Sequence, residues 1–188
     1  VRNDDFTIMM IGSINSGIGV PGVLSLCEEL KNDKVHFVFV GGGSEEDTMR
    51  RYAKEHKLKN ALFIGRKPFS DMPYYFEQAD ALLLSLSNKN LSHIDVIIPA
   101  RLQSYLSAGK PVFAMAGKGV TEIINDAQCG FAVPSGDYQT MTTVIRDCLS
   151  KCNNDLSVLG NNGRKYYEAH FTKAKAIDDL CRLMNIKK

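Results

Sequence analysis

Apolar residues along the chain follow two alternating patterns. Short, nearly continuous apolar runs predict buried strands at 6–12, 34–43, 60–65, 80–87, 110–116 and 131–134. Between them, apolar residues at helical spacing predict helices at 20–33, 44–57, 70–79, 99–109 and 119–128. Two or three helices follow, the last at 172–186. Strands this apolar are buried on both faces, so we expect an α/β fold: a doubly wound, Rossmann-like parallel sheet of about six strands with helices on both faces.

Two of the predicted helices carry start signals. Ser44 is placed to cap the helix after the second strand, with acidic residues in its first turn. Pro99 suits the first position of the helix at 99–109, because its missing N–H would have no partner there. The amides of Ala100 and Arg101 then point out of the helix start, where the dipole favours an anion. Arg101 adds a fixed charge with a bidentate fork, so this helix start is our main candidate for binding phosphate.

Glycine-rich loops follow the first two strands, at the sheet edge where ligands bind in such folds. The first, at 12–22, is either a flexible turn or a loop whose amides at Gly12 and Ser13 approach a phosphate or sugar. It matches neither GxGxxG nor the Walker A pattern. The second contains Gly41 and Gly42 within three successive glycines, which form a plain turn or let a flat nucleobase lie near the main chain.

Two further loops reach the same edge. Gly65, Arg66 and Lys67 follow the third strand and are either solvated or available to a phosphate or base. The segment 88–97 is the longest without a regular pattern, and a long loop after a strand usually serves the site. It contains His93, the one histidine that we consider for substrate contact.

Composition narrows the class of protein. The 188 residues fit one domain with a sizeable core, and the net charge of +2 gives no support for nucleic-acid binding. The five cysteines form no CxxC pair, which favours reduced thiols and a cytoplasmic setting. No apolar stretch reaches the roughly 18–20 residues that span a bilayer. The sequence shows no metal-ligand spacing, and its start at Val1 is consistent with a piece of a longer protein.

Two segments carry a family resemblance: "FVFVGGGSEEDTMRRYAKEHKLKNALFIGRKPFSDMPYYFEQADALLLSL" and "IPARLQSYLSAGKPVFAMAGKGVTEIINDAQCGFAVPSGD". Their order resembles the C-terminal domain of GT-B-fold glycosyltransferases of glycosyltransferase family 4, over nearly the whole chain. The resemblance looks closest to bacterial amino-sugar transferases of O-antigen or capsule synthesis, which have a similar P-[AS]-K-L-Q-x-Y-x-A-A-G-K-P helix. The elements "AGKP" and "EIINDAQCG" are specific for the family, not for the sugar.

The resemblance implies that residues 1–188 form one domain that binds the nucleotide half of a sugar-nucleotide donor, expected to be UDP-linked. The base would lie near the loops that contain Gly41, Gly42, Gly65, Arg66 and Lys67. The diphosphate would lie at Gly12 and Ser13 and at the helix start formed by Pro99, Ala100 and Arg101. Arg101 would be the catalytic residue, stabilising the charge that builds on the departing diphosphate.

For the whole protein, the resemblance implies a retaining transfer of the sugar to a glycan or lipid-linked acceptor in surface polysaccharide synthesis. The donor is a substrate, and no metal or other cofactor is expected. The acceptor would be held by an N-terminal domain outside this chain, so the chain alone would be inactive, and the terminal helix at 172–188 would pack on that domain. A cytoplasmic location is expected. Attachment to the inner face of the membrane is an alternative for the full-length protein.

This sequence departs from the family pattern around the helix at 99–109. Relatives often have two glutamates spaced E-x7-E; counted back from Gly109, the second falls on Ser104 and the first on Val96, beside Asp95. Ser104 or Gln103 could then contact the ribose only as a neutral partner.

The charges expected near the phosphate also differ from the family. Ser13 and Ile18 stand where relatives often have Arg and Lys, so Arg101 leads as the phosphate-binding cation, followed by Lys67 and Lys118. Glu122, in the first turn of the next helix, either contacts the donor or complements the helix dipole. Two alternatives to a transferase stay open: a sugar-nucleotide epimerase of GT-B architecture, and a non-catalytic doubly wound binding module such as a receiver-like domain.

Overall fold

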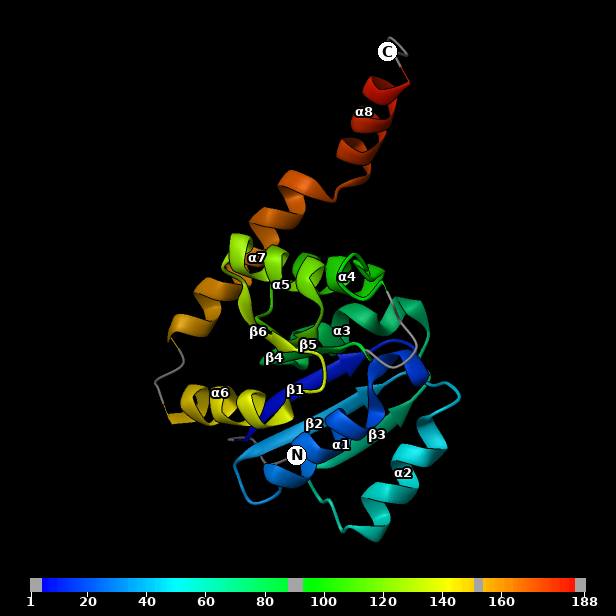
Figure 1. The fold of residues 1–188 in the computed structure, drawn as a ribbon, viewed down its shortest axis with the longest axis vertical. Coiled ribbons are helices and arrows are strands. Elements are labelled where there is room, and N and C mark those ends of the chain that lie inside the picture. The colour runs from blue at the N-terminus through cyan, green and yellow to red at the C-terminus, as the bar shows by residue number, and fades with distance from the viewer. Residues whose placement is uncertain (1–4, 88–92, 151–153, 185–188) are drawn as a thin grey trace.

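A six-stranded parallel sheet lies at the centre of the computed structural model, which describes residues 5–87, 93–150 and 154–184 (Figure 1). The strand order is β3-β2-β1-β4-β5-β6. The strands match the apolar runs of the sequence: β1 Phe6–Ile11, β2 Val35–Val40, β3 Ala61–Gly65, β4 Ala81–Ser85, β5 Val112–Ala116 and β6 Gly130–Pro134. The predicted doubly wound, Rossmann-like fold is therefore confirmed.

Helices cover both faces of the sheet (Figure 1). One layer consists of α1 (Val20–Glu29), α2 (Glu46–Glu55) and α6 (Tyr138–Ser150). The other consists of α3 (Met72–Gln78), α4 (Ala100–Ala108), α5 (Lys118–Ala127) and α7 (Asn154–His170). Successive strand residues serve the two cores in turn, with Ile8 and Met10 packed under the α1 layer and Met9 and Ile11 under the α4 layer. Burial on both faces explains why the strands show no polar alternation.

Two predicted helix starts are corrected by the structure. Ser44 does not cap a helix: α2 begins at Glu46 with Glu45 as N-cap, because the preceding chain is held against the loop after β1 by a hydrogen bond from the Glu45 amide to the Ile14 carbonyl. Pro99 is the N-cap of α4 rather than its first helical residue, since its ψ of 143° is extended and its carbonyl already accepts the Leu102 amide.

The strand order reverses between β1 and β4, and Tyr105 of α4 fills the gap between them. These strands pair only from Ile8 to Met9 on β1, and then diverge. The buried Tyr105 hydroxyl oxygen accepts a hydrogen bond from the Ile11 amide at 2.8 Å. Its proton is shared between the Ile11 carbonyl at 3.1 Å and the Leu83 carbonyl at 3.3 Å. Burial raises the pKa of Tyr105, so the hydroxyl keeps its proton.

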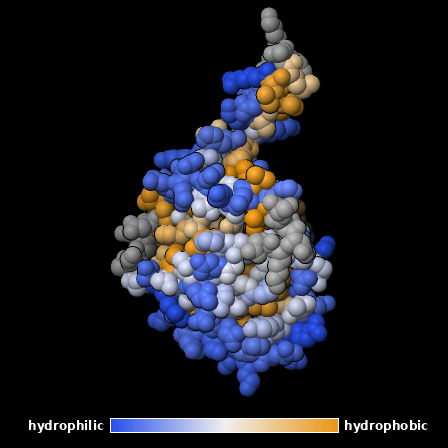
Figure 2. Space-filling model, in the orientation of Figure 1, coloured by the Kyte–Doolittle hydropathy of each residue, from blue (hydrophilic) through white to orange (hydrophobic). Residues whose placement is uncertain are grey.

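The last helix, α8 (Lys173–Leu183), leads away from the rest of the domain (Figure 1). Thr172 caps it by accepting the Lys175 amide with its hydroxyl oxygen. One side of α8 carries exposed apolar residues, seen as hydrophobic surface in Figure 2: Ile177, Leu180, Leu183 and Met184. Within the described ranges, no helix combines the length and the apolar character that crossing a membrane requires.

Candidate functional site

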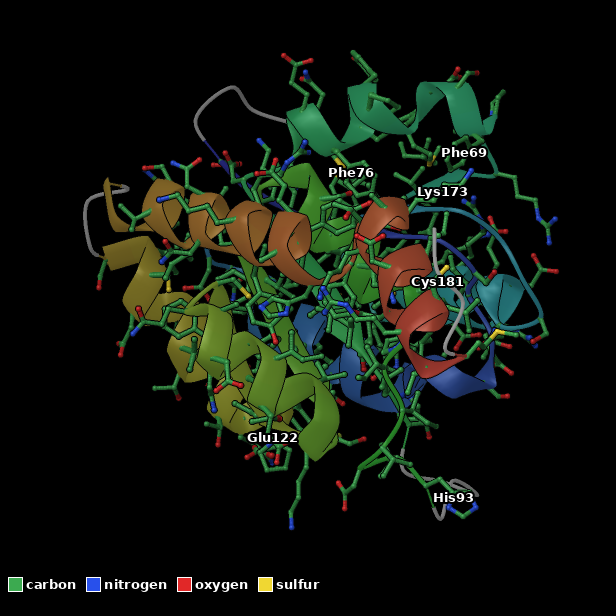
Figure 3. The ribbon with its side chains drawn as sticks, turned by 90° about the horizontal axis from the view of Figure 1, so that it is seen from above. Phe69, Phe76, His93, Glu122, Lys173 and Cys181 are labelled. Atoms are coloured by element: carbon green, nitrogen blue, oxygen red, sulfur yellow. The ribbon has the colours of Figure 1, made fainter. Side chains whose placement is uncertain are left out.

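A cavity of about 1100 Å³ opens at the carboxyl ends of β1 and β4. This is the point where the strand order reverses, and ligands of doubly wound sheets bind there. One wall is the loop after β1, and the other is formed by α4 with the 3-10 helix η2 (Phe69–Asp71) and α3. Figure 3 shows Phe69 and Phe76, which both line the cavity, on the same side of the molecule.

Arg101 lies across the loop that follows β1. Its Nη2 donates to the Ser13 carbonyl at 2.5 Å. Gly12 has a φ of +125°, and a Cβ at that position would come within 3.1 Å of the Arg101 Nε and Nη2 atoms. The backbone conformation therefore favours glycine at position 12, and a side chain there would also displace the guanidinium slightly. This contact joins the two segments that the sequence nominated for the diphosphate.

The start of α4 offers main-chain donors beside this guanidinium. Pro99 caps the helix through its carbonyl alone, without a side-chain hydrogen bond. Among the residues that the structure describes, the amides of Ala100 and Arg101 have no hydrogen-bond partner. Pro99, Ala100 and Arg101 all line the cavity, so unpaired amides and a cation face the same space. That combination suits an anion.

Among the residues that the structure describes, the charged ones in the cavity lining are Arg101, Lys110, Arg164 and Glu77, so cations outnumber carboxylates there. Lys110 donates to the Glu77 carbonyl at 3.0 Å, and Arg164 contacts Glu168 at 2.7 Å. Within the described ranges, Arg101 and Lys110 both have a neutral main-chain carbonyl as partner and no carboxylate, whereas Arg164 is paired with Glu168. Arg101 differs from Lys110 because it lies beside the unpaired amides at the start of α4. The helix start is thus the place in the cavity where a bound negative charge would receive the greatest electrostatic stabilisation.

The successive glycines after β2 serve loop packing. A Cβ on Gly41 would lie 1.9 Å from the Gly12 carbonyl oxygen, and one on Gly43 would lie 2.2 Å from that of Ile14. The Ile14 amide donates to the Gly42 carbonyl at 3.1 Å. These glycines let the second loop lie directly against the first and hold it in place. The two glycine-rich stretches after adjacent strands were the sequence signal for this contact.

The predicted base-binding residues lie beside the cavity and do not line it. The exposed Arg66 extends over Gly42, where an added Cβ would be 2.9 Å from Arg66 Cγ and from Glu46 Oε2. Gly65 follows with a φ of +78°, and Lys67 is exposed. None of Gly41, Gly42, Gly65, Arg66 and Lys67 belongs to the lining.

Ser104 and Gln103 differ in their relation to the cavity. Ser104 lines it, one turn along α4 from Ala100, and its hydroxyl donates to the Ala100 carbonyl at 3.3 Å. Gln103 is not part of the lining. The position where relatives often carry an acid is thus an exposed neutral hydroxyl at the cavity wall.

Asp95, Lys118 and Glu122 lie outside the cavity lining. The Asp95 carboxylate accepts the Lys118 amide at 3.0 Å, and its carbonyl accepts the Gly119 amide at 2.8 Å, so Asp95 fixes its loop to the start of α5. In Figure 3, Glu122 and the exposed His93 lie on the side of the view opposite Phe69 and Phe76. Residues 88–92 of the long loop fall outside the described ranges.

Sequence reasoning missed several residues of the site. Tyr105 stood at a helical position between Leu102 and Leu106, and a tyrosine on a buried face signals that its hydroxyl has a partner. Lys110 and Arg164 gave no such signal, since only the packing of α7 on α4 brings Arg164 to the cavity. Within the described ranges, no group of three or more His, Cys, Asp or Glu side chains is placed to hold a metal ion.

Comparisons with known proteins agree with this architecture. The chain is 24% identical over 164 residues to the probable glycosyltransferase WbjE of Pseudomonas aeruginosa, covering 86% of this chain and 40% of that protein. It is 22% identical to the amylovoran biosynthesis glycosyltransferase AmsK of Erwinia amylovora, covering 94% and 44%. The crystal structure of Anabaena HepE in complex with UDP superposes with a TM-score of 0.80 at 16% identity, covering 97% of this chain and 49% of that one.

The chain spans less than half the length of the two curated relatives named above. The family described as "Glycosyl transferases group 1" matches residues 1–166, which include every strand of the sheet and the whole cavity wall up to Arg164. From a match over this much of its length, the chain belongs to the glycosyl transferases group 1 family.

Proposed function

We propose that this domain binds the donor of a retaining glycosyltransferase that has GT-B architecture and belongs to glycosyltransferase family 4. The family membership and the doubly wound fold support this proposal. The observation that carries it is the Arg101 guanidinium, which lies against the Gly12 loop beside the α4 amides, with neither a balancing carboxylate nor a partner for the Ala100 and Arg101 amides among the described residues. A diphosphate has the charge and the size that this position favours.

The donor is proposed to be a UDP-sugar used in surface polysaccharide synthesis. A structural neighbour was crystallised with UDP, and a sequence relative is named for amylovoran biosynthesis. The diphosphate would lie at Arg101 and the Ala100 amide, and the ribose would lie beside Ser104. Because Ser104 is neutral, it would offer the ribose hydroxyls a weaker hydrogen bond than the carboxylate common in relatives.

Catalysis would be electrostatic. The bond between the anomeric carbon and the diphosphate oxygen breaks with its electron pair left on that oxygen, the acceptor hydroxyl bonds to the same face of the anomeric carbon, and the hydroxyl proton passes to the departing diphosphate. Negative charge develops on the departing diphosphate, where the α4 amides and Arg101 are already oriented. Since these groups supply the positive field, we propose that no metal ion is required; transfer by the full-length enzyme should then be unchanged by a chelator.

Isothermal titration calorimetry of this chain with UDP tests the binding site. Wild-type protein should bind UDP, and Arg101→Ala should weaken binding by about 10- to 100-fold, as expected for loss of charge-assisted hydrogen bonds. Arg146→Ala is the matched control, because Arg146 lies on α6 in the other helical layer and contacts Asp33 at 3.2 Å. Equal UDP affinity in wild type and Arg101→Ala would contradict the proposal.

The acceptor is proposed to bind a separate N-terminal domain, on which the apolar side of α8 packs. Ile177, Leu180 and Leu183 are 44%, 56% and 83% exposed, and an exposed group of apolar side chains of this kind marks a surface that contacts another protein. Without its partner domain, this chain should be inactive and should dimerise through α8 as its concentration rises. Size-exclusion chromatography should show Leu180→Glu to be monomeric at concentrations where wild type dimerises; a wild-type chain that stays monomeric throughout would contradict this packing.

A further inference from the structure

Phe69 is the most exposed of the large apolar side chains in the described ranges. It is 90% exposed, although it lines the cavity. A phenyl ring in water contributes nothing to the core, because the hydrophobic effect stabilises only area removed from water. The domain itself therefore gives no reason for an aromatic residue at this position.

The backbone around Phe69 is well fixed. Phe69 begins the 3-10 helix η2, which follows Pro68 and leads straight into α3 with Pro73 in its first turn. The Asp71 amide donates to the Pro68 carbonyl at 3.0 Å, and the Ser70 hydroxyl donates to the Asp71 carboxylate at 2.9 Å. The ring is thus presented from a short ordered segment, at little further cost in backbone entropy when a ligand binds.

The cavity divides into two chemically different parts. Arg101 and the free amide of Ala100 lie at the start of α4, where an anion is favoured. Phe69, Met72 and Phe76 give the wall contributed by η2 and α3 a mainly apolar surface, to which Ser70 and Glu77 add polar groups. A ligand that fills both parts must join a charged group to a flat apolar ring, and a nucleoside diphosphate has that composition.

We propose that the Phe69 ring stacks on the nucleobase of the donor, while the diphosphate lies at Arg101. This inference rests on the proposed function and adds a residue that neither the family resemblance nor the fold assigns. Stacking on a π-face tolerates every base, so Phe69 would add affinity without choosing between bases. It would supply part of the affinity lost through the neutral Ser104.

Fluorescence tests the contact directly, because the chain contains no tryptophan. Phe69→Trp places one indole at the proposed stacking position, and UDP should quench its emission. Inorganic pyrophosphate should bind without quenching, because it fills the anionic part alone. Tyr74→Trp is the matched control: Tyr74 is 61% exposed on α3 but does not line the cavity, so UDP should leave its emission unchanged.

Calorimetry completes the test. Phe69→Ala should weaken UDP binding by about 10-fold and Phe69→Tyr should not, while pyrophosphate affinity stays the same in all variants. If wild type binds UDP in an Arg101-dependent way but Phe69→Ala binds it equally and Phe69→Trp shows no quenching, stacking is refuted and the proposed function stands. If neither UDP nor pyrophosphate binds to wild type, both proposals fail.

Discussion

The junction of α1 with α2 and the start of α4 differ in whether their polar groups have hydrogen-bond partners within the protein. At the α1–α2 junction, the Glu28 carboxylate accepts the Tyr52 hydroxyl at 2.8 Å and lies 3.2 Å from His56 Nδ1. The Glu28 carboxylate thus has a partner on each of its two oxygens. At the start of α4, Arg101 has only a neutral carbonyl, and the amides of Ala100 and Arg101 are unpaired among the described residues.

This difference shows which polar groups stabilise the domain and which are prepared for a ligand. A buried or half-buried polar group without a partner is costly, so folded proteins pair nearly all of them. The first amides of any helix lack intrahelical partners and Ala100 is exposed, so the informative feature at α4 is that these donors converge with Arg101 on a cavity. The Glu28 cluster, although rich in titratable groups, lines no cavity among those described. Substitutions in the two regions should consequently change different properties.

The largest effect is expected for Arg101→Ala in the full-length enzyme. Loss of the guanidinium should lower kcat/KM by about 10- to 1,000-fold, because it removes charge stabilisation of the departing diphosphate. Steady-state kinetics with the donor measures this change. Arg146→Ala, from the opposite layer, should leave kcat/KM unchanged. Similar activity losses in both variants would mean that Arg101 acts only through folding.

Next in size is the effect of Tyr105→Phe on stability. Removing the hydroxyl leaves the Ile11 amide and the carbonyls of Ile11 and Leu83 without their buried partner, which should cost about 1–3 kcal/mol of unfolding free energy. Urea denaturation measures the loss. Tyr52→Phe should cost less, because Glu28 there stays accessible to water. An equal loss in both would contradict the role given to Tyr105.

The sequence predicted the sheet well, because a strand buried on both faces is a continuous apolar run. The loops and helices between the strands contain polar residues, so the ends of each strand are easy to recognise. It also predicted site roles for Gly12, Ser13 and Arg101, and in the structure Arg101 donates to the Ser13 carbonyl and lies against Gly12. The side-chain geometry could not be predicted. Nothing in the sequence shows that Asp95 accepts the Lys118 amide, since that contact depends on how the loop before α4 returns to α5.

The glycines after β2 illustrate a second limit of sequence reasoning. Their pattern permits a ligand, a turn or a close main-chain contact, and only the register of β1 with β2 decides between these. Because Ile11 pairs with Val40, Gly12 and Gly41 meet directly after their strands, and a Cβ on Gly41 would collide with the Gly12 carbonyl. Phe69 could not be predicted for a related reason, since the exposure of its side chain depends on packing and not on the spacing of apolar residues in the sequence.

The smallest effect that we predict is an acid dependence of stability at the α1–α2 junction. The hydrogen bond from Tyr52, and then that from His56, lowers the pKa of Glu28 below its ordinary value of 4.5. A carboxyl whose pKa is lower in the folded state stabilises the protein above its unfolded pKa, and this stabilisation is lost as the pH falls through the folded pKa. Tyr52→Phe removes the larger cause, so the variant should be less stable than wild type at pH 7 and approach it near pH 3. Urea midpoints at both pH values measure this, and a constant gap between the two proteins would show that Tyr52 acts through packing instead.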